Sequence, residues 1–123
     1  MKRPAPPHLL AKLFRGFGDP SRLSILLLLR TGPRRVSEVV AATGLSQPNA
    51  SMHLACLWEC GLVEREPQGR SVYYRVASSS VTQLLGLAEG ILSAGGDRIE
   101  CCPRYRGVHA KDAPGAQAVP PDR

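Results

Sequence analysis

The chain has 123 residues, enough for one domain with one core and little left for a second. Apolar residues make up 43% of it but aromatic residues only 5%, so the core must be built mainly from leucine, valine and alanine. The net charge of +6 suits a polyanionic partner such as a nucleic acid, although a basic charge alone is a weak signal.

The sequence predicts a cytoplasmic protein. Its longest apolar run, residues 25–29, is far too short to span a membrane. The basic N-terminus, MKRPAPPHLLAKLF, has no long apolar run or small-residue cleavage site of a secretion signal. Because thiols stay reduced in the cytoplasm, the four cysteines are expected to be ligands or reactive groups rather than disulfide partners.

Helical spacing predicts two helices in the first third of the chain, after a flexible, proline-rich segment 1–7. The first helix carries its apolar residues at helical intervals and ends at Gly18; they are Leu9, Leu10, Leu13, Phe14 and Phe17. Asp19 as N-cap and Pro20 at the first helical position begin the second helix, SRLSILLLLR. This helix is apolar on most sides and should be central to the core, and residues 31–33 end it.

Two short helices separated by a tight turn come next. We expect Ser37 to cap the first of them and Gly44 to end it. Ser46 should cap the second, which runs from Gln47 to about Cys60. The inward-facing residues are predicted to be Val39, Val40 and Ala42 in the first and Ala50, Leu54 and Leu57 in the second.

The apolar period then changes from that of a helix to that of a strand. The segment LVEREPQGRSVYYRV predicts a β-hairpin that turns around residues 67–70. A fifth helix follows at about residues 80–93, and the polar composition after Gly95-Gly96 predicts a flexible tail, residues 97–123. The chain is thus expected to be mainly α with a small β-hairpin: a winged helix-turn-helix over residues 8–96 that binds DNA and dimerises.

In such a fold the second helix of the helix-turn-helix enters the major groove, and the hairpin contacts the DNA backbone beside it. The side chains suited to bases or phosphates are Ser46, Gln47, Asn49, Ser51 and His53 on the helix, and Arg65, Arg70, Tyr73 and Arg75 on the hairpin. Each of them alone could equally be a solvated surface residue. The order of the elements together with the basic hairpin is what favours DNA binding.

The segments DPSRLSILLLL, VSEVVAATGLSQPNASMHLACLWECGLV and EPQGRSVYYRV resemble the ArsR/SmtB family of bacterial metal-responsive repressors. The likeness covers about residues 8–93. It implies a homodimer, joined mainly through the first and last helices, that leaves its operator DNA when an inducer binds. The apolar stripes for such a contact are Leu9, Leu13 and Phe17 in the first helix and Leu84 and Ile91 in the fifth.

Cys56 and Cys60 are four residues apart in the predicted DNA-reading helix. Residues at this spacing share one helical face, with Cβ atoms roughly 5–6 Å apart, so both sulfurs can reach one soft metal ion. A disulfide between them is disfavoured, because parallel Cβ vectors fit S–S geometry poorly. The alternative is that each is a buried small apolar residue.

The tail contains the other two cysteines, Cys101 and Cys102, in a polar segment with no core to bury a thiol. Exposed thiols without a role would be prone to oxidation. We therefore predict that the tail folds over the helix and completes a site of three or four thiolates. Asp97, Glu100 and His109 are candidate extra ligands, although each is better explained as a solvated tail residue.

The resemblance narrows the site. The family places some inducer sites on the third helix or along the fifth, but here the third lacks cysteine and the fifth lacks histidine. A CxxxC pair followed by GLV, with a cysteine in the tail, is similar to the CmtR-like branch that senses cadmium and lead. The pattern is matched by Cys56, Cys60 and Cys101. Cys102 is not part of it: this residue could replace Cys101 as a ligand, add a fourth ligand, or take no part in the site. The tail cysteine could come from either subunit of the dimer.

Three or four thiolates favour soft or borderline ions, namely Cd(II), Pb(II), Zn(II), Hg(II), Cu(I) or trivalent arsenic. Our hypothesis is that Cd(II) is the inducer and that Pb(II) also binds, with arsenite as a competitor. A thiol-based redox repressor would use the same residues. An enzyme using Cys56 with His53 lacks a third orienting group and a substrate pocket, and a structural zinc module would use CxxC knuckles on loops, so neither is expected.

Overall fold

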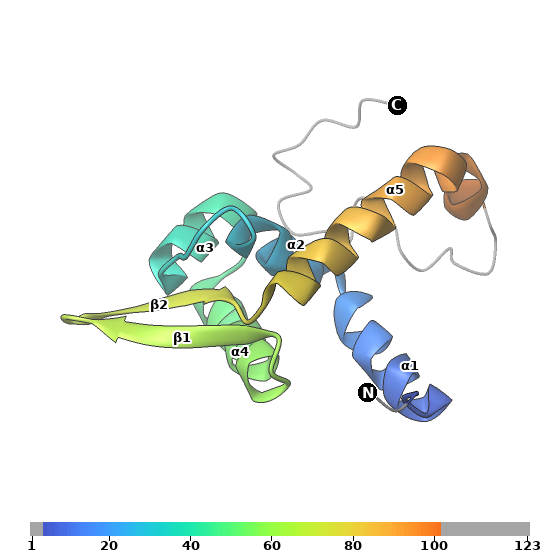
Figure 1. Ribbon diagram of the computed structural model, residues 1–123. Helices are drawn as coiled ribbons and strands as arrows, with labels where there is room; N and C mark the ends of the chain where they lie inside the picture. The colour runs from blue at the N-terminus through green and yellow to red at the C-terminus, as the bar shows by residue number, and fades with distance from the viewer. Residues whose placement is uncertain (1–3, 102–123) are drawn as a thin grey trace.

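The computed structural model describes residues 4–101, except for the side chains of residues 96, 97 and 99–101. Its elements in chain order are α1 (Pro7–Phe17), α2 (Pro20–Leu29), α3 (Val36–Thr43), α4 (Gln47–Glu59), β1 (Val63–Gln68), β2 (Ser71–Val76) and α5 (Ser79–Cys101) (Figure 1). This order confirms the predicted winged helix-turn-helix. No helix in the described range is both long enough and apolar enough to cross a membrane.

Helix α2 lies at the centre of the fold. It begins where predicted, because the Asp19 carboxylate accepts a hydrogen bond from the backbone N–H of Arg22 at 2.9 Å and Pro20 occupies the first turn. Ile25, Leu26 and Leu29 are almost fully buried. They pack with the predicted stripe of α4, which is Ala50, Leu54 and Leu57. Burial of each large apolar side chain stabilises the fold by about 1.5–3 kcal/mol.

Helices α3 and α4 form the helix-turn-helix. Gly44 ends α3 in the left-handed conformation (φ +79°), as predicted. The start of α3 differs from the prediction: Arg35, not Ser37, is the N-cap, and the Glu38 carboxylate accepts a hydrogen bond from its backbone N–H at 2.9 Å. The inward face differs too, because Ala42 is exposed whereas Thr43 is buried, four residues after Val39 and hydrogen-bonded to its carbonyl at 2.7 Å.

The hairpin β1–β2, here called the wing, projects from the body of the molecule (Figure 1). Its strands pair from Val63↔Val76 to Gln68↔Ser71, so the turn is a two-residue loop, Gly69-Arg70, narrower than predicted. Gly69 has φ +62°, which fits the first position of such a loop and is strained for other residues. Midway along β2, the backbone groups of Tyr74 exchange hydrogen bonds of 2.8 and 2.9 Å with those of Arg34, which anchors the wing to the segment before α3.

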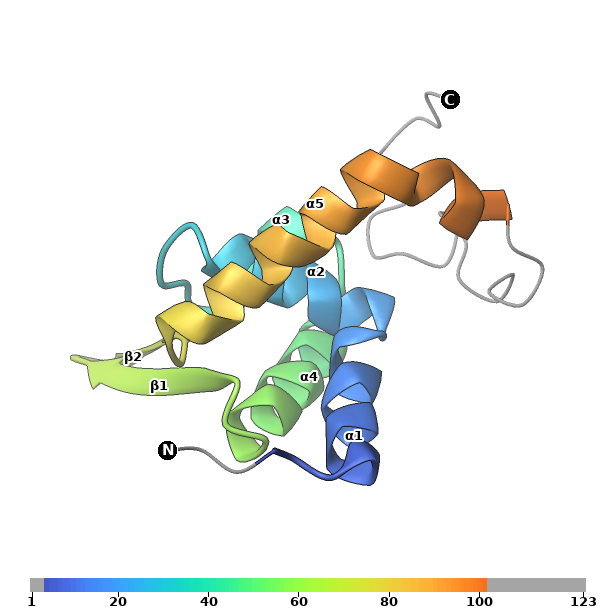
Figure 2. The same ribbon diagram turned by 45° about the vertical axis from the view of Figure 1, so that its right-hand side comes forward.

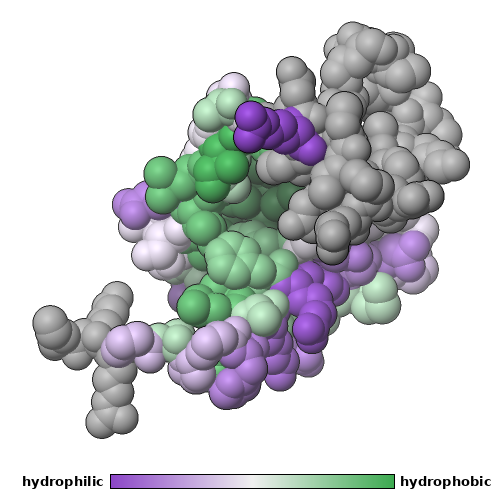
Figure 3. Space-filling model, turned by 90° about the vertical axis from the view of Figure 1, so that its right-hand side faces the viewer, coloured by the Kyte–Doolittle hydropathy of each residue, from purple (hydrophilic) through white to green (hydrophobic). Residues whose placement is uncertain are grey.

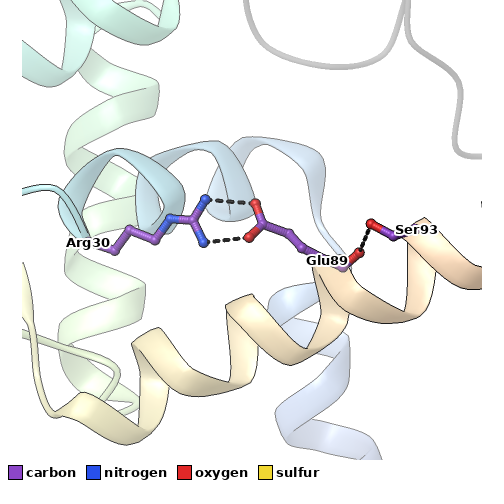
Figure 4. A network of polar contacts seen from close by, with 3 residues as sticks. All are labelled: Arg30, Glu89 and Ser93. Carbon is purple, nitrogen blue, oxygen red and sulfur yellow. Dashed lines mark hydrogen bonds and ion pairs between the residues drawn. The ribbon is translucent and has the colours of Figure 1, made fainter.

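Helix α5 runs diagonally past α2, and its far end lies clear of the other helices (Figures 1 and 2). The sequence predicts an end at about Ser93, but the structure continues the helix to Cys101 past non-helical geometry at Gly95 (φ −147°, ψ 26°). The glycines therefore kink the helix rather than stop it. Arg30 at the end of α2 holds α5 through two hydrogen bonds of 2.9 and 2.7 Å to the carboxylate of Glu89 (Figure 4).

Helices α1 and α5 leave apolar side chains uncovered in the single chain. We call these residues the apolar face: Leu9, Leu10, Leu13 and Phe14 of α1, and Leu87, Ile91 and Leu92 of α5. Apolar side chains gather on the side of the molecule where both helices lie (Figure 3). Two residues expected in this face are not exposed, because Phe17 is buried in the core and Leu84 packs against it.

Candidate nucleic-acid interface and thiol pair

The N-terminal turns of α4 present polar side chains to solvent. Ser46 caps the helix, its hydroxyl oxygen accepting a hydrogen bond from the backbone N–H of Asn49 at 3.2 Å. Gln47, Asn49 and Ser51 are exposed, whereas Ala50 faces the core. Free N–H groups and the positive end of the helix dipole meet at this end, so its surface suits a phosphate or base edge.

His53 differs from these exposed residues. Its side chain is half-buried, and its Nδ1 atom is buried without a hydrogen-bond partner among the described residues. A buried nitrogen without a partner is costly, and a water or an ion is one usual explanation. Of the candidate side chains on α4, His53 is thus the one least available to DNA in this structure.

The three wing arginines differ in what they contact. Arg70 at the tip is exposed and has no ion-pair partner among the side chains that the structure describes. Arg75 pairs with two carboxylates of β1, Glu64 at 2.8 Å and Glu66 at 3.8 Å. Arg65 stacks on the ring of Trp58 in α4, and Tyr73 is half-buried. Arg70 is therefore the wing cation most available to a phosphate.

Cys56 and Cys60, here called the thiol pair, occupy the last turn of α4. The N–H of Cys60 donates to the carbonyl of Cys56 at 3.0 Å, so the helix geometry persists between them. Cys60 is the C-cap, followed by Gly61 in the left-handed conformation (φ +80°), which a side chain would strain. The backbone N–H of Leu62 donates to the carbonyl of Leu57 at 2.9 Å, and that of Gly61 donates to the carbonyl of Trp58 at 3.0 Å. These two hydrogen bonds form a Schellman motif, which fixes this turn.

The burial of the two thiols does not favour an apolar packing role. Cys56 is half-buried and Cys60 is exposed, so neither fills the core as a small apolar residue would. Partial burial raises the pKa of the Cys60 thiol, and the neighbouring Cys56 raises it further. The charges of Arg22 and Lys12 act on this pKa in the opposite direction.

Arg22 belongs to α2 and Lys12 to α1, and the sequence alone does not indicate that either helix lies near the thiols. One terminal nitrogen of the Arg22 guanidinium, in α2, lies 3.9 Å from the Cys56 sulfur. The Nε atom of the same side chain donates a hydrogen bond to the Gly16 carbonyl of α1 at 3.1 Å. Nothing in the local sequence signals this contact, since Arg22 and Cys56 are 34 positions apart.

The thiol pair fits one half of a site for a soft ion. Two sulfurs project from one rigid turn, and thiolates are the donors that such ions prefer. Within the described range, no group of three or more histidine, cysteine or acidic residues could hold a metal ion. The predicted completing ligands, Cys101 and Cys102, lie outside what the structure describes of side chains, as do Asp97, Glu100 and His109.

Comparison with known proteins identifies the family. Residues 19–65 match the model of the bacterial regulatory protein family arsR. A probable mercury resistance operon repressor of Streptomyces lividans is 36% identical over 101 residues, covering 82% of this chain and 81% of the relative. The regulator CmtR of Mycobacterium tuberculosis is 39% identical over 90 residues, covering 72% of this chain and 76% of the relative.

Solved structures of other proteins have the same fold as this chain. The crystal structure of Mycobacterium tuberculosis Rv0081 aligns with a TM-score of 0.70 and 30% identity, covering 78% of this chain and 99% of that one. The solution structure of the homodimeric winged helix-turn-helix domain of Mycobacterium bovis Mb0332 aligns with a TM-score of 0.66 and 32% identity, covering 77% and 93%. CmtR is named as a transcriptional regulator and Mb0332 as a possible ArsR-family transcriptional regulator, so the family and the fold indicate a DNA-binding regulator rather than an enzyme. The chain therefore belongs to the ArsR family of bacterial DNA-binding regulatory proteins.

Proposed function

We propose that this chain is a repressor that binds operator DNA as a homodimer in the cytoplasm and is released when a soft metal ion, Cd(II) or Pb(II), binds its cysteine thiolates. The observation that carries the proposal is the position of the thiol pair. Cys56 and Cys60 lie in the last turn of α4, and the first turns of the same helix present Gln47, Asn49 and Ser51 to solvent.

The apolar face supports the dimer. Its seven residues are 36–70% exposed in the single chain, which is a large amount of apolar surface for water to cover. The Mb0332 domain, which has the same fold, is named as a homodimer. A second copy covering α1 and α5 would bury these side chains and set two α4 helices at a fixed spacing, as recognition of two operator half-sites requires.

Two features support the site. The thiol pair supplies two sulfurs from a fixed turn, and the C-terminal end of a helix favours a positive charge nearby. A bound ion would draw Cys101, Cys102 or both toward this turn. A hundredfold loss of operator affinity needs about 2.7 kcal/mol of coupling, which is small beside the roughly 10–16 kcal/mol released when several protein ligands bind zinc in a small domain.

The coupling can act through what the chain places beside that turn. Arg65 of the wing stacks on Trp58, and Arg22 connects the Cys56 sulfur to α1. A ligand that pulls on the thiol pair therefore acts on the wing and on a helix of the apolar face together. Both determine whether the two reading helices match the operator.

The choice of ion follows from the donors. Three or four thiolates select soft ions and exclude magnesium or calcium. One relative is named as a probable mercury resistance operon repressor, which supports a response to a soft ion, and CmtR bears the name of the branch that the cysteine pattern resembles. Hg(II), Zn(II) and arsenite bind similar donors and belong in the test as competitors of Cd(II) and Pb(II).

The test is operator binding of the full chain, measured by fluorescence anisotropy with each ion added in turn. Thiolate-to-metal absorption bands report binding in the same samples. The wild type should release DNA at one equivalent of Cd(II), whereas Cys56→Ser and Cys60→Ser should stay bound. Cys101→Ser and Cys102→Ser, adjacent in sequence, serve as each other's control and show which tail cysteine matters.

Two results would overturn the proposal. One is normal release of Cys56→Ser by every ion. The other is release of the wild type by peroxide under metal-free conditions together with no response to any ion, which would identify a redox-sensing repressor.

A further inference from the structure

Arg22 occupies the first turn of α2, and its side chain reaches two other helices. Its Nε donates to the Gly16 carbonyl of α1 at 3.1 Å, and one terminal nitrogen lies 3.9 Å from the Cys56 sulfur of α4. Its backbone N–H donates to the Asp19 cap of its own helix at 2.9 Å. One half-buried residue thus connects α1, α2 and the thiol pair.

The two side-chain contacts need a guanidinium. The Gly16 carbonyl is one of the last four of α1, which have no partner within the helix, so it is free to accept from Arg22. A guanidinium donates along several fixed directions from one plane. A lysine ammonium carries the same charge but cannot reproduce this fork between two elements.

The position of the charge matters as much as its geometry. A divalent ion held by three thiolates carries a net charge of −1, and a fourth thiolate adds another. The Arg22 guanidinium lies against the Cys56 sulfur, and the charges of Arg22 and Lys12 both act on Cys60. Groups that hydrogen-bond metal ligands commonly set ligand orientation and metal affinity.

We propose that Arg22 is a positioning residue of the thiol site: it orients the Cys56 sulfur, neutralises the anionic thiolate complex and ties that sulfur to the end of α1. The inference rests on the proposed function and adds to it a connection from the thiol site to the dimer contact. α1 carries four residues of the apolar face, so occupancy of the thiol site is transmitted to the dimer contact through Arg22.

The test measures Cd(II) affinity of the full chain by competition with a chelator, together with the thiolate-to-Cd(II) absorption band. Arg22→Gln should weaken binding by about 10- to 100-fold, as is usual when a group that supports a metal ligand is removed. The Cd(II) affinity of Arg22→Lys should lie between those of Arg22→Gln and the wild type, because lysine keeps the positive charge but cannot contact the Gly16 carbonyl and the Cys56 sulfur together. Arg15→Gln is the matched control: it removes an equal charge from an exposed residue in the last turn of α1 and should leave affinity unchanged.

A double-mutant cycle separates a role at the sulfur from a purely structural one. If Arg22 acts through Cys56, then Arg22→Gln should change Cd(II) affinity less than twofold when Cys56→Ser is already present. If Arg22 only fastens α1, its loss should lower the thermal midpoint while folded protein binds Cd(II) as tightly as the wild type. That second result, or an equal effect in both backgrounds, overturns the inference. Absence of a thiolate band in the wild type overturns the proposed function itself, which is a different outcome.

Discussion

Arg65 of β1 lies over the ring of Trp58 in α4, with its guanidinium carbon 3.8 Å from the ring centroid. Trp58 is two residues from each member of the thiol pair, so it projects from a different face of the helix. The wing is thereby held against the turn that carries the thiols. A cation–π contact at an exposed site contributes about 0.5–1 kcal/mol, enough to bias the wing without locking it.

This contact predicts different roles for two wing arginines. Arg70 is exposed at the tip and free for a phosphate, whereas Arg65 is engaged with Trp58. Arg70→Gln should lower operator affinity and reduce the slope of log K against log salt by about 0.9, as the loss of one phosphate contact does. Arg65→Gln should lower affinity by misplacing the wing and leave the slope unchanged.

The measurement is operator anisotropy over a series of KCl concentrations. Arg65→Lys is a useful third variant, because it keeps the charge while losing the flat stacking of the guanidinium. It should resemble Arg65→Gln if stacking is what matters. If Arg65→Gln flattens the salt slope as much as Arg70→Gln does, Arg65 contacts phosphate directly instead of positioning the wing through Trp58.

The pair of Arg30 and Glu89 predicts a pH dependence of stability. The hydrogen bonds from Arg30 lower the pKa of Glu89 from its usual value of 4.5; burial acts in the opposite direction, and the charge of Arg30 adds a smaller lowering. A pKa lowered by folding means that the pair stabilises the folded state above the unfolded-state pKa, and that this stability is lost as the pH falls through the folded-state pKa. Glu89→Gln should therefore melt below the wild type at neutral pH, with the gap closing below about pH 4.5.

Thermal unfolding of the two proteins at a series of pH values checks this expectation. The effect is expected to be small, since both side chains are accessible to solvent. Glu59→Gln is the control, because Glu59 is exposed and has no ion-pair partner in the described part of the chain. A gap that stays constant down to acid pH would show that the loss comes from packing of α5 rather than from the ion pair.

The fold was predictable where local chemistry decides it. Asp19 and Ser46 accept the hydrogen bonds expected of N-caps, and Gly44 and Gly61 adopt the left-handed conformation that ends a helix. The prediction failed where two local solutions compete. The Glu38 carboxylate caps α3 in place of the Ser37 hydroxyl, and α5 continues past Gly95 although glycine commonly ends a helix.

The site was predictable only in part, for a related reason. Four-residue spacing on a helix is a local rule, so the shared face of Cys56 and Cys60 could be read from the sequence. The contacts of Arg22 with Cys56 and of Arg65 with Trp58 join elements that only the folded chain brings together. Spacing cannot reveal them, and they determine which arginines remain free for DNA.

Ser46 combines two roles that substitution can separate. Its hydroxyl caps α4, and it lies at the helix end proposed to meet the DNA backbone. Ser46→Ala should lower the free energy of unfolding by about 1 kcal/mol, the usual effect of losing such a cap. Ser46→Asp restores an acceptor for the Asn49 N–H and should keep the stability, but its negative charge should repel a phosphate and weaken operator binding.

Urea unfolding and operator anisotropy give the two readouts. Ser51→Ala is the matched control for stability, because Ser51 is exposed and its side chain makes no hydrogen bond within the described residues. If Ser46→Asp binds the operator as tightly as the wild type, this end of α4 does not approach a phosphate, and the proposed docking of the helix fails.

The apolar face makes a prediction about assembly. Phe14 is 53% exposed in the single chain, so a charge there costs the chain's own core little, yet it would lie in the proposed dimer contact. Phe14→Asp should give a folded monomer by light scattering at concentrations where the wild type is dimeric. Its far-UV circular dichroism should be unchanged, and its affinity for an operator with two half-sites should fall, because the monomer loses the second half-site.

The control for this experiment is Val72→Asp, which places the same charge on another exposed apolar residue, 39% exposed and located on the wing. It should remain a dimer. Ile91→Asp probes the other helix of the apolar face, where the side chain is 63% exposed. If Ile91→Asp dissociates the dimer and Phe14→Asp does not, α5 alone forms the contact, and Arg22 would then have no dimer helix to act on through Gly16. If both dissociate it, the connection from the Cys56 sulfur through Arg22 to α1 ends at the interface that sets the spacing of the two reading helices.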